Sequence, residues 1–127
     1  MIIEEGTYVK KAEQVIKQLS QNKDKYGKVR WITTSKIRNL LAMSADIYNE
    51  VLLSPEKLSD EQSARIDYLR VRFVYEAGRD KDVKNFVEKA QILKALEEVR
   101  GSRKQYILFN HYMEALVAYH RYYGGRD

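Results

Sequence analysis

The chain has 127 residues, of which 44% are hydrophobic and 32% charged, with a formal charge of +5 and no cysteine. This length suits one domain with a sizeable core, and the lack of cysteine excludes a disulfide framework and a thiolate metal site. The N-terminus turns charged at once and no apolar run is long enough for a bilayer, so we expect a cytoplasmic protein without a membrane partner.

The first half of the chain predicts two helices separated by a basic linker. The first helix has apolar residues at helical spacing on one face: Tyr8, Val9, Ala12, Val15, Ile16 and Leu19. The linker is polar and rich in lysine, and it ends in the sequence KVRWI. The second helix runs from about Ser35 to Leu53, and its predicted core side is Ile37, Leu40, Leu41, Ile47, Tyr48, Val51 and Leu52.

The second half predicts three more helices, each with a recognisable start. Ser59 and Gln62 form a capping box for the third helix, which ends at Gly78. Its inward residues are Ile66, Leu69, Phe73, Val74 and Ala77. An Asp cap opens a fourth helix that continues through Leu96 to Gly101, and Ser102 caps a fifth, from about Arg103 to Tyr123.

No strand pattern and no repeat is present, and the connections between the helices are short. Short connections place successive helices side by side in opposite directions. We therefore expect an all-α fold: a single-domain bundle of about five antiparallel helices over residues 1–127.

The second helix begins with charges of the wrong sign. Three hydroxyl residues, 33–35, are candidate N-caps, but the first turn then holds Lys36 and Arg38, and Lys28 and Arg30 stand just upstream. The positive end of the helix dipole should favour Asp or Glu here. The pattern raises the question of which anion this charge meets.

Charge is also divided along the chain. Residues 23–38 hold six cations and one anion, whereas residues 46–67 hold six carboxylates and two cations. Such a bipolar surface suits a protein that meets a polyanion on one side and protein neighbours on another. Chance clustering on a solvated surface is the alternative.

Three arginines of the third helix stand at heptad spacing. Arg65, Arg72 and Arg79 drift only ~40° around a straight helix and span roughly 21 Å along it. This stripe either faces phosphates or pairs with local carboxylates such as Glu76, and both interpretations stay open.

Catalytic signatures are missing: no phosphate-binding loop, dinucleotide fingerprint, nucleophile elbow or zinc-protease motif occurs. His111 and His120 lie on nearly opposite faces of one helix, so they cannot share a metal ion within the monomer. His120 falls in the apolar stripe of this helix, and we therefore predict that it is a hydrogen-bonded core histidine. The tyrosines of that helix are expected in the core or at an interface. We predict no catalytic residue, metal ligand or cofactor.

Three stretches carry a resemblance to a known family. TTSKIRNLLAM (33–43), VRFVYEAGRD (71–80) and YMEALVAYHRYYGG (112–125) together resemble the small subunit of the type III-A CRISPR–Cas (Csm) effector complex. The resemblance covers most of the chain and implies a small, all-helical, non-catalytic protein. It also implies that several copies stack head to tail beside the backbone subunits that hold the CRISPR RNA, and contact the guide–target duplex.

In this context the anion at the second helix is expected to be an RNA phosphate, contacted without regard to sequence. The expected partners are the CRISPR RNA, the target RNA, the backbone and large Csm subunits, and further copies of the chain. The candidate RNA-binding residues are Lys28, Arg30, Lys36, Arg38, Arg65, Arg72 and Arg79. Removing Lys36 or Arg38 is expected to leave folding intact, or to stabilise it slightly by relieving an unfavourable dipole interaction.

Two other classes of function fit the same residues. A free-standing helical nucleic-acid adaptor would bind RNA or DNA without partner subunits. A purely structural oligomerisation module would use its arginines as interface ion pairs.

Overall fold

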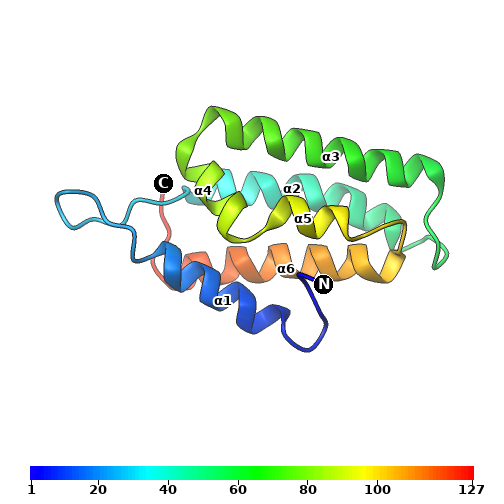
Figure 1. Ribbon diagram of the computed structural model, residues 1–127, viewed down its shortest axis with the longest axis horizontal. Coiled ribbons are helices and arrows are strands. Elements are labelled where there is room, and N and C mark those ends of the chain that lie inside the picture. The colour runs from blue at the N-terminus through cyan, green and yellow to red at the C-terminus, as the bar shows by residue number, and fades with distance from the viewer.

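The computed structural model describes residues 1–127 and is all-α, as the sequence predicts. The helices are α1 (Tyr8–Leu19), α2 (Thr34–Val51), α3 (Asp60–Arg79), α4 (Lys81–Lys89), α5 (Ile92–Glu97) and α6 (Arg103–Tyr122). Successive helices run in opposite directions, with α4 and α5 following each other in the same sense (Figure 1). No helix combines the length and apolarity needed to cross a bilayer.

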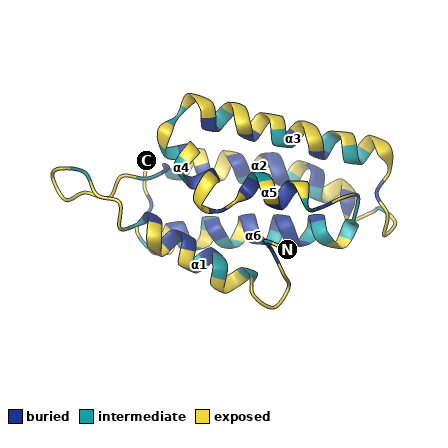
Figure 2. Cartoon of the chain, in the orientation of Figure 1, coloured by how far each residue is buried: buried dark blue, intermediate teal, exposed yellow.

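Helix α6 is the centre of the packing. It lies against both α1 and α2, while α3 covers α2 and packs on α4 and α5, and Figure 2 shows the buried surface turned toward the middle of the bundle. Tyr106 and Tyr112 of α6 are fully buried, and their hydroxyls donate to the carbonyls of Ser44 and Ala90 at 2.8 and 2.9 Å. The prediction that tyrosines of this helix belong to the core is confirmed for these two.

The predicted helix starts are confirmed by their hydrogen bonds. The Ser59 hydroxyl accepts from the Gln62 backbone N–H, and the Gln62 side chain accepts from the Ser59 N–H, both at 3.1 Å. The Ser102 hydroxyl accepts from the Gln105 N–H at 3.1 Å. Asp80 accepts from two backbone N–H groups in the first turn of α4. These caps connect residues two or three positions apart, which is why the sequence pattern reveals them.

The predicted fourth helix is wrong as one continuous element, because the chain breaks between α4 and α5. Gln91 adopts a left-handed conformation, with φ of 56°. The buried positions change phase there: they are Val83, Phe86, Val87 and Ala90 before the break, and Ile92, Ala95, Leu96 and Val99 after it. A continuous helix could not turn both sets toward one core.

Several boundary predictions also need correction. Helix α3 continues through Gly78 to Arg79, and Asp80 in an extended conformation ends it. Val9 and Val74 lie at the edges of their apolar stripes and are exposed, and Leu52 is exposed because α2 has already ended.

Candidate nucleic-acid interface

A narrow basic loop projects from one end of the bundle, between α1 and α2 (Figure 1). Asp24 shapes its tip, because its carboxylate accepts from the backbone N–H groups of Tyr26 and Lys28 at 2.8 and 3.1 Å. Gly27 takes a φ of 80°, which favours glycine. Lys28 is exposed and forms no ion pair, and the Tyr26 side chain beside it is also exposed.

The base of this loop is fastened to α4. Arg30 and Asn22 exchange hydrogen bonds: the Arg30 N–H donates to the Asn22 carbonyl at 2.7 Å, and the Asn22 amide donates to the Arg30 carbonyl at 2.9 Å. The Arg30 guanidinium then lies 3.7 Å from the Asp82 carboxylate on α4. Arg30 is therefore directed to the side of the bundle, away from the tip that carries Lys28.

The start of α2 already holds an anion, and it belongs to the chain itself. The backbone N–H and the hydroxyl of Ser35 donate to one carboxylate oxygen of Asp127 at 2.7 and 2.6 Å. The Thr34 N–H donates to the Arg126 carbonyl at 3.1 Å. These bonds from Ser35 hold the pKa of Asp127 below its usual value. A phosphate can occupy this position only if the Asp127 carboxylate leaves it.

The two cations in the first turn of α2 have different surroundings. Lys36 forms an ion pair with Asp80, the residue that caps α4, and this bond is the main cause of a lowered pKa at Asp80. Arg38 is exposed and forms no ion pair. The unfavourable dipole at Lys36 is therefore offset by a tertiary contact that links α2 to the α3–α4 corner.

This difference changes the expected effect of removing Lys36. We expect Lys36→Ala to lower the free energy of unfolding by about 0.5–1 kcal/mol, as for a partly exposed ion pair, and to raise the pKa of Asp80. Arg38→Ala should stay within about 0.5 kcal/mol of the parent protein. Urea denaturation measures the first effect and NMR titration of the Asp80 carboxyl the second; equal stability of both variants and an unshifted Asp80 would contradict the tertiary role of Lys36.

The arginine stripe of α3 is partly neutralised by local carboxylates. Arg65 pairs with Glu50 of α2, and Arg79 lies 3.8 Å from Glu76. Arg72 forms no ion pair. The three arginines therefore do not form one row of free cations, and the pairing alternative describes two of them in this structure.

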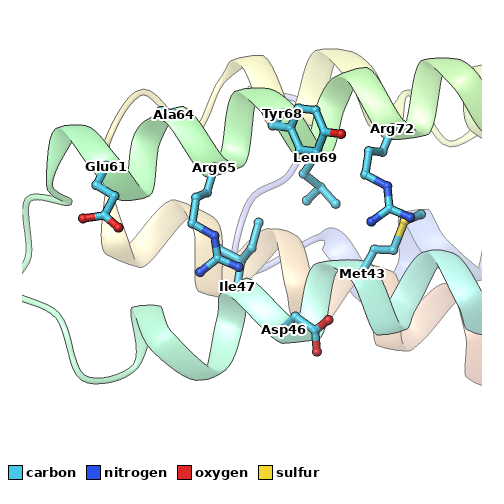
Figure 3. A pocket seen from close by; sticks show the side chains of 9 residues that line it. All are labelled: Met43, Asp46, Ile47, Glu61, Ala64, Arg65, Tyr68, Leu69 and Arg72. Atoms are coloured by element: carbon cyan, nitrogen blue, oxygen red, sulfur yellow. The ribbon is translucent and has the colours of Figure 1, made fainter.

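Arg65 and Arg72 border a groove of about 510 Å³ between α2 and α3. Figure 3 shows both side chains reaching from α3 toward α2, on either side of Leu69. Met43 and Ile47 of α2 line the same groove. Five of its nine lining residues are hydrophobic. A groove of this composition suits the packing of a side chain from another protein better than the binding of a phosphate backbone.

The outer face of α3 carries exposed apolar residues beside these arginines. Tyr68 and Tyr75 are 65% and 64% exposed, and the exposed Val71 lies on the same face. Aliphatic side chains gain little from contact with a phosphate backbone, whereas tyrosine and arginine are enriched in the buried part of protein interfaces. This face therefore favours a protein neighbour.

The two histidines of α6 are each engaged separately. His120 is fully buried, with Nε2 2.8 Å from the Ile32 carbonyl and its ring packed on Trp31 at 4.6 Å between centroids. His111 Nε2 lies 3.3 Å from the Tyr48 hydroxyl. The prediction of a hydrogen-bonded core histidine at position 120 is confirmed. No group of three or more histidine and carboxylate side chains is arranged to hold a metal ion.

His120 makes stability depend on pH. Burial lowers the pKa of His120 below the usual value of 6.5, and it outweighs the hydrogen bond to the Ile32 carbonyl, which raises the pKa. The nearby charge of Arg121 also lowers the pKa, and Nδ1 of His120 is buried without a partner. The unfolded chain therefore takes up the proton first, so stability is complete above about pH 6.5 and is lost as the pH falls below it. We expect urea denaturation to show a fall of up to about 1.4 kcal/mol per pH unit between about pH 6.5 and the lowered pKa of the folded protein. The same slope in His120→Gln would assign it to other groups.

The chain is similar to known proteins along nearly its whole length. A family model for Csm2 of type III-A matches residues 9–126. The Csm2 protein of the CRISPR system of Streptococcus thermophilus is 46% identical over 127 residues, covering 99% of this chain and 98% of that protein. Csm2 of Mycobacterium tuberculosis is 39% identical over 128 residues (100% and 99%), and Csm2 of Enterococcus italicus is 34% identical over 120 residues (88% and 86%). Since the match extends over nearly the whole of each chain, this chain belongs to the Csm2 family, the small subunit of type III-A Csm complexes.

Proposed function

We propose that this chain is a non-catalytic subunit that stacks in several copies, head to tail, within a cytoplasmic type III-A effector complex and contacts the guide–target RNA backbone. The observation that carries the proposal is the polarity of the bundle. The basic loop and the start of α2 lie at one end, and the connection between α2 and α3, which carries exposed carboxylates, lies at the other (Figure 1).

Free cations at the basic end support the RNA contact. Lys28 and Arg38 are exposed and unpaired, and the exposed Lys25 belongs to the same loop as Lys28, whereas Arg38 is on α2. Lysine and arginine contacts to phosphate position a strand without reading its bases. That property suits a complex in which base pairing with the guide supplies the specificity.

The seven candidate residues then divide into two groups. Lys28, Arg38 and Arg72 are free to bind a phosphate directly. The others reach one only by exchanging a carboxylate partner within the chain: Arg30, Lys36, Arg65 and Arg79. We therefore assign the main contact to Lys28 and Arg38.

Stacking is supported by the opposite end of the molecule. Glu56, Asp60 and Glu61 are exposed around the α2–α3 connection, together with Leu53. These carboxylates stand beside the exposed Lys57, and we propose that they pair with free cations at the basic end of another copy. Such a contact between unlike surfaces produces an open filament when the rotation between copies does not close a ring. The outer face of α3, with its exposed tyrosines, offers a further surface for a neighbouring Csm subunit.

The test is the binding of target RNA by the reconstituted complex as a function of salt. Lys28→Ala and Arg38→Ala are each expected to lower the slope of log affinity against log salt by ~0.7, equally for every guide sequence. Lys94→Ala is the matched control, because Lys94 is an exposed and unpaired lysine on α5, outside the basic end. Unchanged slopes in both basic-end variants would show that these cations do not touch RNA.

The isolated chain separates this function from the two alternatives. A small subunit should bind RNA weakly alone and more tightly once stacked with its partners. A free-standing adaptor would bind RNA equally well alone and with its partners. A purely structural module would assemble with its partners normally, but its presence would not change the affinity of the complex for RNA.

A further inference from the structure

A polar cleft lies beside the basic loop, between the end of α1 and one face of α4. Its volume is about 500 Å³, which is within the range of ligand-binding pockets, and only one of the nine lining residues, Leu19, is hydrophobic. The lining holds no aromatic side chain, so an apolar ligand gains little there, and the Arg30 guanidinium is the one flat group on which a base can stack. A ligand that fits must itself be polar over most of its surface.

The cleft is rich in positive charge. Arg30, Lys81 and Lys89 line it, with Asp82 as the one carboxylate. Asp82 lies 3.7 Å from Arg30, whereas Lys81 and Lys89 form no ion pair. Two ammonium groups are thus left without an anion at opposite ends of the same helix face.

Helix α4 explains this arrangement. Lys81, Asn85 and Lys89 are spaced by four residues, so they follow one stripe of the helix, while Val83 and Phe86 turn inward to the core. The ends of the stripe are ~12 Å apart at the rise of an α-helix. That separation is about the length of two nucleotides in an extended single strand, so each lysine can meet a different phosphate.

Amide side chains line both sides of the cleft, with Asn85 between the two lysines on α4 and two glutamines at the end of α1. Gln18, Gln21 and Asn85 line the cleft, and none of their side chains forms a hydrogen bond within the protein. Each offers donors and an acceptor to a hydroxyl group. The order cation, amide, cation along α4 matches the alternating phosphates and ribose hydroxyls of an RNA backbone.

We infer that this cleft binds the ribose-phosphate backbone of an RNA strand, with Lys81 and Lys89 on phosphates and the amides on the intervening ribose. The inference rests on the proposed RNA-binding function and extends it to residues outside the seven sequence candidates, apart from Arg30. It places the strand along α4, at the side of the bundle, so the strand runs on from the loop that carries Lys28.

The first test is the assembled complex carrying Lys81→Ala and Lys89→Ala together. The slope of log affinity against log salt should fall by ~1.4, and affinity for target RNA should drop about tenfold at physiological salt, for two lost single-strand phosphate contacts. Lys84→Ala is the matched control, because Lys84 is an exposed lysine on the same helix that does not line the cleft. Since all three side chains point to solvent, the helical content and unfolding midpoint should match the parent protein.

The second test uses the isolated chain and an oligouridylate strand. Amide NMR signals of Gln18, Gln21 and Asn85 should shift on titration, and the shifts should be absent in the double lysine variant. An oligodeoxyuridylate strand should shift them less, and Asn85→Ala should reduce that difference, because the amide contacts the 2′-hydroxyl.

The outcomes separate this site from the proposed function. If the double variant behaves as Lys84→Ala while Lys28→Ala still lowers the salt slope, the cleft is not an RNA site and the function stands. If the double variant leaves the salt slope unchanged but releases a neighbouring subunit, the lysines meet an acidic protein surface and the inference is wrong. If Lys28→Ala, Arg38→Ala and the double variant all leave the salt slope unchanged, the proposed function fails together with this inference.

Discussion

Replacing Asn110 by alanine is expected to lower the free energy of unfolding by about 2–3 kcal/mol. Asn110 is buried in α6, and its side-chain oxygen accepts from the Ser44 hydroxyl of α2 at 2.6 Å. Its amide donates to Glu114 at 2.9 Å. The alanine variant creates a void and removes the short hydrogen bond of the buried Ser44 hydroxyl, which keeps only a long contact of 3.4 Å to the Tyr106 hydroxyl. Loss of a buried hydrogen bond in this way costs about 1–3 kcal/mol, and the void adds to it.

The expected loss is specific to the α2–α6 contact. Asn49→Ala is the matched control, since Asn49 is exposed on α2, and it should change stability by less than about 0.5 kcal/mol. Ser44→Ala should be milder than Asn110→Ala. Because the two side chains share one hydrogen bond, a double-mutant cycle should show coupling of about 0.5 kcal/mol or more. Additive effects of the two variants in urea denaturation would contradict the contact.

The second large effect is expected for Gly125→Ala. A methyl group at position 125 would lie 2.2 Å from two atoms of the His120 ring. The ring cannot move aside easily, because it is fully buried, bonded to the Ile32 carbonyl and packed on Trp31. Overpacking of this kind costs about 1–3 kcal/mol.

The strain at Gly125 should also be visible at the start of α2. If the backbone after α6 shifts to make room, the Asp127 carboxylate leaves Ser35, so the pKa of Asp127 should rise toward its usual value and the Ser35 amide signal should move. Gly78→Ala is a control of opposite sign: it lies in open space within α3, and alanine should stabilise the helix by about 0.5–1 kcal/mol. A Gly125→Ala protein with parental stability and an unchanged Asp127 would contradict the packing.

The two variants have different consequences for RNA binding under the proposed function. Asn110→Ala acts in the core, so the surviving folded protein should bind RNA with its parental salt slope. Gly125→Ala removes the carboxylate from the start of α2 and leaves the first turn of that helix, from Thr34 to Lys36, without its own anion. That turn should then bind a phosphate at least as well as before, since a competing negative charge is gone.

The local features of this protein could be read from its sequence. Apolar spacing located the helices, and the Ser59, Asp80 and Ser102 caps were visible because each acts on N–H groups two or three residues away. His120 was recognisable as a core residue because it sits in an apolar stripe. The three family stretches were likewise contiguous in the sequence. Each of these signals depends on a short stretch of chain.

Only the tertiary structure decided which charges are free. Ser35 meets Asp127 across 92 positions of sequence, and Lys36 meets Asp80 across 44. The order of residues does not show such pairings, since they depend on which helix ends the core brings together. The break after Ala90 and the polar cleft along α4 have the same origin. Helix periodicity is a property of neighbouring residues, whereas the partner of a surface charge is set by how the whole bundle packs.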